Sequence, residues 1–176
     1  MEHIERVQRE LKYKGAILSM YADTIKVPNG NTAVWDFIGH QGAAAVVPVT
    51  DDGKILMVRQ YRNSVDRYTL EIPAGGLNSK DEPTIEAAAR ELEEETGYAS
   101  EHLEPLISIV TAIAFCDEVI DIYLATGLKK TQQHLDEDEY IDVYAYTPQE
   151  LDDMIYSGKI QDSKTVAAIM AYINRK

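Results

Sequence analysis

Residues 76–98 read GLNSKDEPTIEAAARELEEETGY, a glycine followed by a helix-length segment that is rich in glutamate and carries a single arginine. At about 100° per residue, Glu91, Glu94 and Glu95 fall within roughly 100° of arc on one side of a helix. The apolar stripe expected beside them consists of Ile85, Ala89 and Leu92. The segment therefore predicts a helix with an acidic side next to its buried face.

Three like charges gathered on one side of a helix need a physical reason. Each such pair at i,i+3 or i,i+4 costs roughly 0.2–0.5 kcal/mol of helix stability. Hard divalent ions such as Mg²⁺ take oxygen ligands and bridge carboxylates to substrate phosphates. The acid trio therefore predicts a cation site, with Arg90 among the acids as a residue that orients them. An ordinary solvated, glutamate-rich surface helix is the alternative.

The residues on either side of the acidic segment favour the cation site. Gly97 stands where a helix C-cap belongs. Gly75 and Gly76 come before the segment, after the strand-like stretch RYTLEIPA at 67–74. Since glycine permits close backbone approach, the acidic helix would begin beside a loop that can accept a phosphate.

The acidic segment and its flanks follow the pattern G-x5-E-x7-R-E-U-x-E-E-x-G-U. Its fixed places are held by Gly76, Glu82, Arg90, Glu91, Leu92, Glu94, Glu95, Gly97 and Tyr98. This pattern resembles the signature of the Nudix hydrolases, which cleave nucleoside diphosphates linked to another group; only Tyr98 departs, where an aliphatic residue is usual. Outside it, the segments that resemble the bacterial ADP-ribose pyrophosphatases of that family are HQGAAAVVPV at 40–49, VRQYR at 58–62, LEIPAGG at 70–76 and GKIQDSKTVAAI at 158–169.

Composition is consistent with a compact enzyme. A chain of 176 residues with 45% hydrophobic content can bury one well-formed core. The net charge of −13 argues against nucleic acid or an anionic membrane as a partner. The single cysteine, Cys116, fits a reducing compartment, and MEHIERVQREL at the start lacks an apolar signal core. We therefore expect a cytoplasmic protein that acts on a small molecule.

Alternating and apolar runs predict the remaining elements. Strands are expected at 15–27, 31–40, 42–50, 55–62, 67–72, 106–115, 118–128 and 140–147, and helices at 148–156 and 162–173. The Asn-Gly turn at 29–30 predicts one hairpin, and the DDGK turn at 51–54 predicts a second. The polar stretch 129–139 is expected to be an exposed loop.

This order of elements predicts an α/β fold, in which helices cover mixed sheets. It agrees with what the resemblance implies, a Nudix-type α/β/α sandwich with mixed sheets. Residues 1–40 are expected to form a small N-terminal β extension, and residues 41–176 the hydrolase domain. In the ADP-ribose-hydrolysing relatives such an extension exchanges between protomers, so the resemblance also implies a homodimer.

The resemblance assigns roles in metal and phosphate binding. It implies that the Ala74 carbonyl adds a metal ligand to Glu91, Glu94 and Glu95. Either Gly75 or Gly76 would lie at the phosphate-side turn. Arg62 could form two hydrogen bonds to a pyrophosphate, because guanidinium geometry suits bidentate phosphate contacts. Alternatively, Arg62 could form a surface salt bridge.

Further roles concern the nucleoside, the ribose and the catalytic base. An adenine-stacking aromatic is implied near Trp35 and Asp36, although a tryptophan is more often a core residue. Glu71 would hold the far ribose or pair with an arginine, and Glu118 is a further substrate-binding candidate. In the late acidic loop the resemblance implies a catalytic glutamate. Glu139 is the first choice, Glu137 the second.

Together these features predict Mg²⁺-dependent hydrolysis of ADP-ribose to AMP and ribose 5-phosphate, with Mn²⁺ as an alternative metal. Another nucleoside diphosphate derivative, such as a sugar nucleotide or NADH, is a second candidate substrate. It gains support from Ile113, which stands where the ADP-ribose group usually has a proline. A module that binds ADP-ribose without cleaving it and a purely structural acidic helix are the non-enzymatic alternatives.

Overall fold

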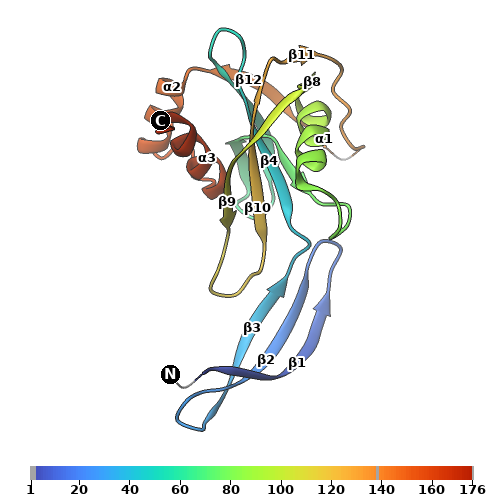
Figure 1. The fold of residues 1–176 in the computed structure, drawn as a ribbon, viewed down its shortest axis with the longest axis vertical. Helices are drawn as coiled ribbons and strands as arrows, with labels where there is room; N and C mark the ends of the chain where they lie inside the picture. The colour runs from blue at the N-terminus through green and yellow to red at the C-terminus, as the bar shows by residue number, and fades with distance from the viewer. Residues whose placement is uncertain (1–2, 138, 176) are drawn as a thin grey trace. The chain divides into compact units, whose positions relative to one another are not determined.

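The computed structural model describes residues 3–137 and 139–175 (Figure 1). The chain divides into two compact units, one of residues 1–42 with 110–119 and one of residues 43–109 with 120–176. The loop 110–119 thus groups with the N-terminal sheet, whereas the sequence placed it in the second domain. The predicted division into 1–40 and 41–176 as functional domains stays a prediction.

The N-terminal unit is built on an antiparallel sheet of three strands in the order β1-β2-β3. The strands are β1 (Glu5–Lys14), β2 (Ser19–Lys26) and β3 (Thr32–Gly39). The predicted Asn-Gly hairpin is confirmed, because β2 pairs with β3 and Gly30 between them has a φ of 85°. The side chain of Asn29 accepts a hydrogen bond from the Asn31 amide and stabilises this turn.

Strand β1 was not predicted, because its sequence is dominated by charged residues. Arg9 explains how such a segment joins the sheet. Its guanidinium donates two hydrogen bonds to Asp23 on β2, at 2.7 and 2.6 Å, and lies 3.6 Å from the ring centroid of Phe37 on β3. Cross-strand pairing therefore outweighs the low strand propensity of the charged residues.

The larger unit contains two main sheets (Figure 1). One has the order β7-β4-β10-β9, with β7 (Ala74–Gly76), β4 (Ala43–Pro48), β10 (Val119–Thr126) and β9 (His102–Val110). The other has the order β12-β5-β6, with β12 (Asp142–Tyr146), β5 (Ile55–Arg62) and β6 (Arg67–Glu71). A short pair joins β8 (Tyr98–Ala99) and β11 (Lys129–Lys130).

The second predicted hairpin is wrong. The turn at 51–54 forms, with the Thr50 amide donating to the Lys54 carbonyl, but β4 and β5 enter different sheets and share only the bridge between Val49 and Ile55. The reason is that β4 is flanked on both sides, by β10 in parallel and by β7 in antiparallel pairing. The predicted strand 106–115 is also too long, since β9 ends at Val110.

Three helices complete the unit. They are α1 (Thr84–Thr96), α2 (Pro148–Tyr156) and α3 (Ser163–Ile173), which confirms the helices expected from the sequence. Gly97 ends α1 in the left-handed conformation, with φ 69°. Thr147 and Glu150 form a capping box at the start of α2, and Asp162 caps α3.

Strand β4 is covered on both faces, which explains its uninterrupted apolar sequence. Its alternate residues Ala43, Ala45 and Val47 belong to a core shared with α2 and α3. Between them, Ala44 packs with Ala87 and Ala88 of α1, and Val46 packs with Leu92 of α1. The predicted α/β/α sandwich is confirmed (Figure 1).

One part of the expected apolar stripe on α1 is wrong. Ile85 is 41% exposed, and Ala87 and Ala88 occupy the buried positions instead. Ile85 is the second residue of α1 and lies ahead of Ala87 and Ala88, the first residues of the helix that pack against β4. In the described parts of the chain, none of the helices has the length and apolar character that crossing a membrane requires.

Candidate active site

The acids of the motif lie together on α1, where Arg90 links them. Arg90 Nη1 donates to Glu91 Oε1 at 2.5 Å and to Glu94 Oε2 at 3.0 Å. Its Nε lies 3.5 Å from Glu82 Oε1. Glu91 and Glu95 are buried, whereas Glu94 is partly exposed. Arg90 thus contacts three of the motif acids, and its role in orienting them stays a prediction.

The glycine turn approaches this cluster closely. A Cβ on Gly75 would lie 2.2 Å from the Glu91 carboxyl carbon, so any larger residue would displace that carboxylate. A Cβ on Gly76 would meet nothing within 4 Å, while its carbonyl accepts from Arg90 Nη2 at 3.2 Å. The amide of Ala74 donates to Glu95 Oε2 at 3.1 Å. Of the two candidate glycines, Gly75 is the one that must remain glycine for steric reasons.

Burial shifts the acids toward their neutral forms. Desolvation, together with the charge of Glu91, raises the pKa of Glu95 to about 8. Desolvation also raises the pKa of Glu91, although the charge of Arg90 opposes the shift. Two neighbouring buried carboxyls therefore cannot both ionise without further positive charge.

The donor set fits a hard divalent cation, because its carboxyl oxygens are the ligands that Mg²⁺ prefers. Within residues 3–137 and 139–175, however, no group of three or more histidine, cysteine, aspartate or glutamate side chains is arranged around a common metal position. Glu91 and Glu94 point to Arg90 instead. Metal binding would require these carboxylates to exchange part of this ion pairing for the cation.

The late acidic loop is anchored to the end of α1. The Gln133 side chain donates to the Glu95 carbonyl at 2.7 Å, and the His134 amide donates to the Glu94 carbonyl at 3.0 Å. The negative charge of Glu139 contributes to the raised pKa of both Glu91 and Glu95. Glu139 is therefore electrostatically coupled to the acidic cluster, and the choice between Glu139 and Glu137 as the catalytic base stays a prediction.

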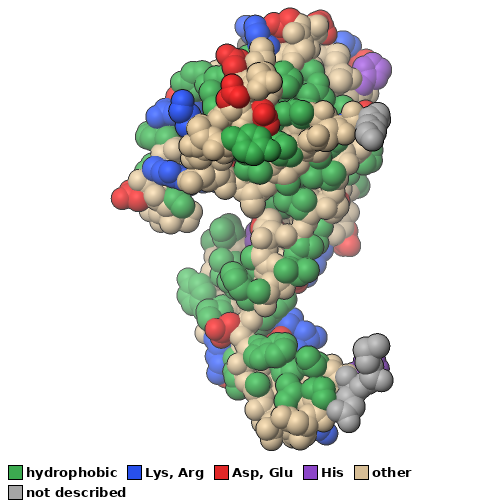
Figure 2. Space-filling view, turned by 90° about the vertical axis from the view of Figure 1, so that its left-hand side faces the viewer, with side chains coloured by type: hydrophobic (Ala, Val, Ile, Leu, Met, Phe, Trp, Pro, Cys, Tyr) green, Lys and Arg blue, Asp and Glu red, His purple; other side chains and the backbone are tan. Residues whose placement is uncertain are grey.

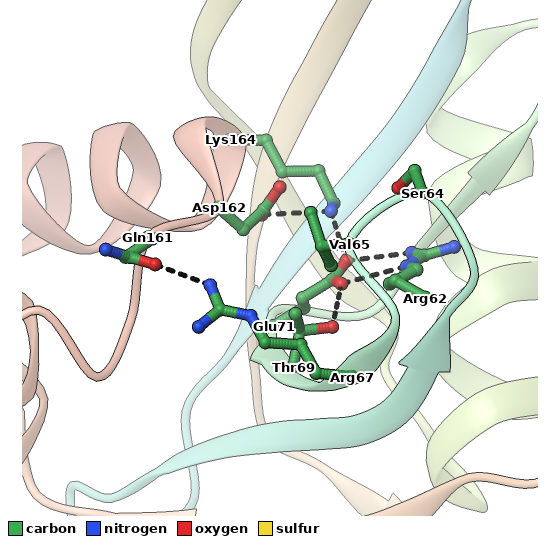
Figure 3. Close-up of a pocket in the computed structure, with 9 residues that line it drawn as sticks. All are labelled: Arg62, Ser64, Val65, Arg67, Thr69, Glu71, Gln161, Asp162 and Lys164. Atoms are coloured by element: carbon green, nitrogen blue, oxygen red, sulfur yellow. Dashed lines mark hydrogen bonds and ion pairs between the residues drawn. The ribbon is translucent and has the colours of Figure 1, made fainter.

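Arg62 and Glu71 contact each other in the lining of a pocket of about 430 Å³ (Figure 3). Arg62 Nε and Nη2 donate to the two carboxylate oxygens of Glu71 at 2.9 and 2.8 Å. Of the two roles expected for Glu71, the structure thus shows the pairing with an arginine. Thr69 and Lys164 donate to the same carboxylate. Burial would raise the pKa of Glu71, but hydrogen bonds from Arg62 and the charge of Lys164 lower it to about 2.

Sequence reasoning assigned no role to Lys164, which completes this network from α3. The available signal was a lysine in the segment GKIQDSKTVAAI that resembles the ADP-ribose pyrophosphatases. Its burial could not be read from the sequence, because lysine is almost never buried unless it is paired.

The other candidates lie in the N-terminal unit. Trp35 is 49% exposed and lines a pocket of about 410 Å³ together with Asp36, Phe37 and residues of the loop 110–119. Glu118 accepts from Thr111 Oγ1 at 2.7 Å, and its other oxygen lies 3.4 Å from His40 Nδ1. The tryptophan is thus a pocket-lining side chain and not a core residue.

An α/β/α sandwich with acids on one helix, set against a glycine turn, has the architecture of a hydrolytic enzyme. Residues 39–169 match the family model of the NUDIX domain. The chain therefore belongs to the Nudix hydrolase family.

Several curated proteins are similar over most of the chain. A methanol dehydrogenase activator of Bacillus methanolicus is 41% identical, over 93% of this chain and 89% of its own length. An ADP-ribose pyrophosphatase of Bacillus subtilis is 37% identical over the same shares, and one of Mycobacterium tuberculosis is 35% identical over 97% of this chain and 84% of its own length. A crystal structure of an ADP compounds hydrolase, 20% identical, shares the fold with a TM-score of 0.85 over 97% of this chain and 92% of its own.

Proposed function

We propose that this protein hydrolyses the pyrophosphate bond of ADP-ribose, giving AMP and ribose 5-phosphate. The observation that carries the proposal is the cluster of buried motif acids on α1 beside Gly75, in a chain similar to two ADP-ribose pyrophosphatases. The direct test is incubation of ADP-ribose and Mg²⁺ with the protein, followed by chromatography of the products. Recovery of uncleaved ADP-ribose would refute the proposal and favour a binding module.

Glu91, Glu94, Glu95 and the Ala74 carbonyl would hold Mg²⁺, or Mn²⁺ in its place. When bound, the metal supplies positive charge for the phosphate oxygens and lowers the pKa of a water molecule. Arg90 keeps the carboxylates in place, as its contacts with Glu91 and Glu94 indicate. Arg62 would hold the diphosphate beside them, at the turn formed by Gly75 and Gly76.

Glu139 would accept the proton of the attacking water, with Glu137 as the second candidate for this role. The electrostatic coupling of Glu139 to Glu91 and Glu95 supports this order. Replacing a general base costs typically about 10²–10⁴ in rate. Glu139→Gln should therefore reduce kcat at least 100-fold, and Glu137→Gln should leave it near wild type. The reverse result would move the role to Glu137.

In the N-terminal unit, we propose that the pocket beside Trp35 receives the adenine, with Asp36 and Glu118 as further substrate contacts. Two aromatic side chains support this assignment, since Trp35 and Phe37 both line the pocket. Trp35→Ala should raise KM for ADP-ribose much more than it lowers kcat. An unchanged KM would remove the tryptophan from the substrate site.

A second candidate is the same chemistry on another nucleoside diphosphate derivative, such as a sugar nucleotide or NADH. One observation favours it: Ile113, which is 84% exposed, stands in the loop where the ADP-ribose group usually has proline. A panel of ADP-ribose, ADP-sugars, NAD⁺ and NADH, compared by kcat/KM, separates these substrates.

We further propose that the protein is a cytoplasmic homodimer. All ten residues of the edge strand β1 are exposed, and its Val7, Leu11 and Tyr13 are each at least half exposed. Figure 2 shows hydrophobic side chains at the surface of this sheet, which a second copy of the chain could cover. Light scattering should give about twice the 19.7 kDa mass of one chain, and a monomer mass would refute the dimer.

A further inference from the structure

The start of α3 buries a lysine beside the proposed active site. Lys164 is only 8% exposed, and its Nζ donates to Glu71 and, at 2.9 Å, to Asp162 (Figure 3). An ammonium group loses its hydration on burial and is retained only where carboxylates replace the water. Lys164 is thus fixed in one position by two acids, unlike an ordinary surface lysine.

A second set of bonds docks the start of α3 onto the end of β6. Asp162 Oδ2 accepts from both the amide and the hydroxyl of Thr165. The Thr165 hydroxyl oxygen in turn accepts from the buried Ile72 amide at 3.0 Å. Two residues later, the Ala74 amide donates to Glu95. The first turn of α3 is therefore connected through the segment 71–74 to the acids of α1.

Glu71 lies between two cations in this arrangement. It is 2% exposed, and its carboxylate accepts from Arg62 on one side and from Lys164 on the other, with Thr69 completing its hydrogen bonds. The negative charge of Glu95 contributes to the raised pKa of Arg62, and the positive charge of Arg62 partly opposes the rise in the pKa of Glu95. The side chain that holds Arg62 near the acidic cluster is thus itself held by Lys164.

We infer that Lys164 is a positioning residue of the active site, which acts through Glu71 to hold the Arg62 guanidinium where the substrate diphosphate binds. The inference rests on the proposed function, because the contact between Arg62 and the diphosphate is part of that function. In the described residues, Lys164 forms ion pairs with Glu71 and Asp162. Of these two acids, Glu71 also pairs with Arg62, so the effect of Lys164 on Arg62 passes through Glu71.

The first test is kinetic. Lys164→Met keeps most of the length of the side chain and removes its ammonium group. Loss of a residue that supports a substrate ligand typically costs about 10- to 100-fold, so kcat/KM should fall by this factor. This fall in kcat/KM should come mainly from a higher KM, because Arg62 contacts the diphosphate both before and during the reaction. A purely structural role would instead lower kcat through a smaller active fraction and leave KM unchanged.

A double-mutant cycle shows whether the effect passes through Glu71. In a Glu71→Gln background, Lys164→Met should change kcat/KM by less than about 3-fold, because the link to Arg62 is already broken. An equal loss in both backgrounds would overturn the inference. Lys159→Met is the matched control, since Lys159 lies five residues earlier and is exposed, and it should behave like wild type.

Two further measurements keep the test decisive. If Lys164→Met melts below the assay temperature, Lys164→Gln carries the kinetic test, and wild-type kinetics would overturn the inference.

The ¹H–¹⁵N resonance of Arg62 Nε, assigned with Arg62→Lys, reports the hydrogen bond to Glu71 without any substrate. This resonance should shift in the Lys164 variants and stay unchanged in Lys159→Met; an unchanged resonance in both would overturn the inference. Failure to cleave ADP-ribose would refute the proposed function alone.

Discussion

Glu71 and Glu95 are both buried glutamates of the larger unit, 2% and 4% exposed, yet their pKa values lie far apart. Glu71 is surrounded by Arg62, Lys164 and Thr69, and its pKa is lowered to about 2. Glu95 has Glu91 as its close charged neighbour and a backbone amide as its donor, and its pKa is raised to about 8. The protein thus neutralises one buried acid with its own cations, whereas burial beside a second acid favours the protonated form of the other.

We propose that the difference separates an acid that holds other side chains in place from acids that bind a metal. A carboxylate whose partners are all internal is part of the scaffold, whereas one held among other acids gains from a bound metal. If this account is right, replacing the two glutamates should produce different kinds of damage.

The largest effect is expected for catalysis after Glu95→Gln. A metal contributes several kcal/mol to transition-state stabilisation, so kcat should fall by about 1000-fold at saturating Mg²⁺. Folding should be unharmed, because the neutral amide suits a site that disfavours charge. Glu86→Gln, on the exposed side of α1, is the control. Wild-type turnover in Glu95→Gln, or in Glu94→Gln, would show that the assigned metal role is wrong.

Glu71→Gln should damage stability, in addition to the weaker substrate binding expected once Glu71 no longer holds Arg62. It leaves Lys164 and Arg62 without their shared carboxylate, and breaking a buried ion pair typically costs about 3–5 kcal/mol. We expect about 3 kcal/mol, measured by urea unfolding at pH 7. A stability within 0.5 kcal/mol of wild type, on the order of a typical surface substitution, would contradict the structural role.

A matched pair of glycine variants tests the steric part of the site. Gly75→Ala should push the Glu91 carboxylate away from its position and reduce kcat about 100-fold, as expected for a displacement of about 1 Å. Gly76→Ala meets open space and should keep most of the activity. Equal losses in both variants would show that backbone flexibility, and not the contact with Glu91, requires glycine here.

The smallest effect is a pH dependence of stability in metal-free protein. The folded state holds the Glu95 proton up to about pH 8, whereas the unfolded state releases it near the ordinary pKa of 4.5. Its contribution to stability therefore falls as the pH rises through this window, by about 1.4 kcal/mol per unit. Between pH 6.5 and 7.5, wild type should lose about 1 kcal/mol more than Glu95→Gln in urea unfolding with EDTA. Parallel curves would contradict the raised pKa.

Much of this arrangement could be predicted from the sequence. The spacing of Glu91, Glu94 and Glu95 placed three acids on one side of a helix, and Gly97 marked its end. Local patterns of this kind depend on a few neighbouring residues, so they survive in the fold. The ranking of Glu139 above Glu137 as the catalytic base stays a prediction.

What could not be predicted depends on contacts between distant segments. The pairing of β4 with β10, and not with β5, joins segments that lie far apart in the chain, and the turn at 51–54 gave no sign of it. Strand β1 depends on Arg9 reaching Asp23. Lys164 lies 93 residues from Glu71 in the chain, so their ion pair was visible only in the structure.

The most direct test of the contrast between the two acids is a carboxyl ¹³C titration of glutamate-labelled, metal-free protein. The Glu95 resonance should titrate near pH 8, while Glu71 should stay ionised down to about pH 2. Saturating Mg²⁺ should lower the midpoint of Glu95 below pH 7 and leave Glu71 unchanged. A Glu95 midpoint near 4.5 that does not respond to Mg²⁺ would contradict the account.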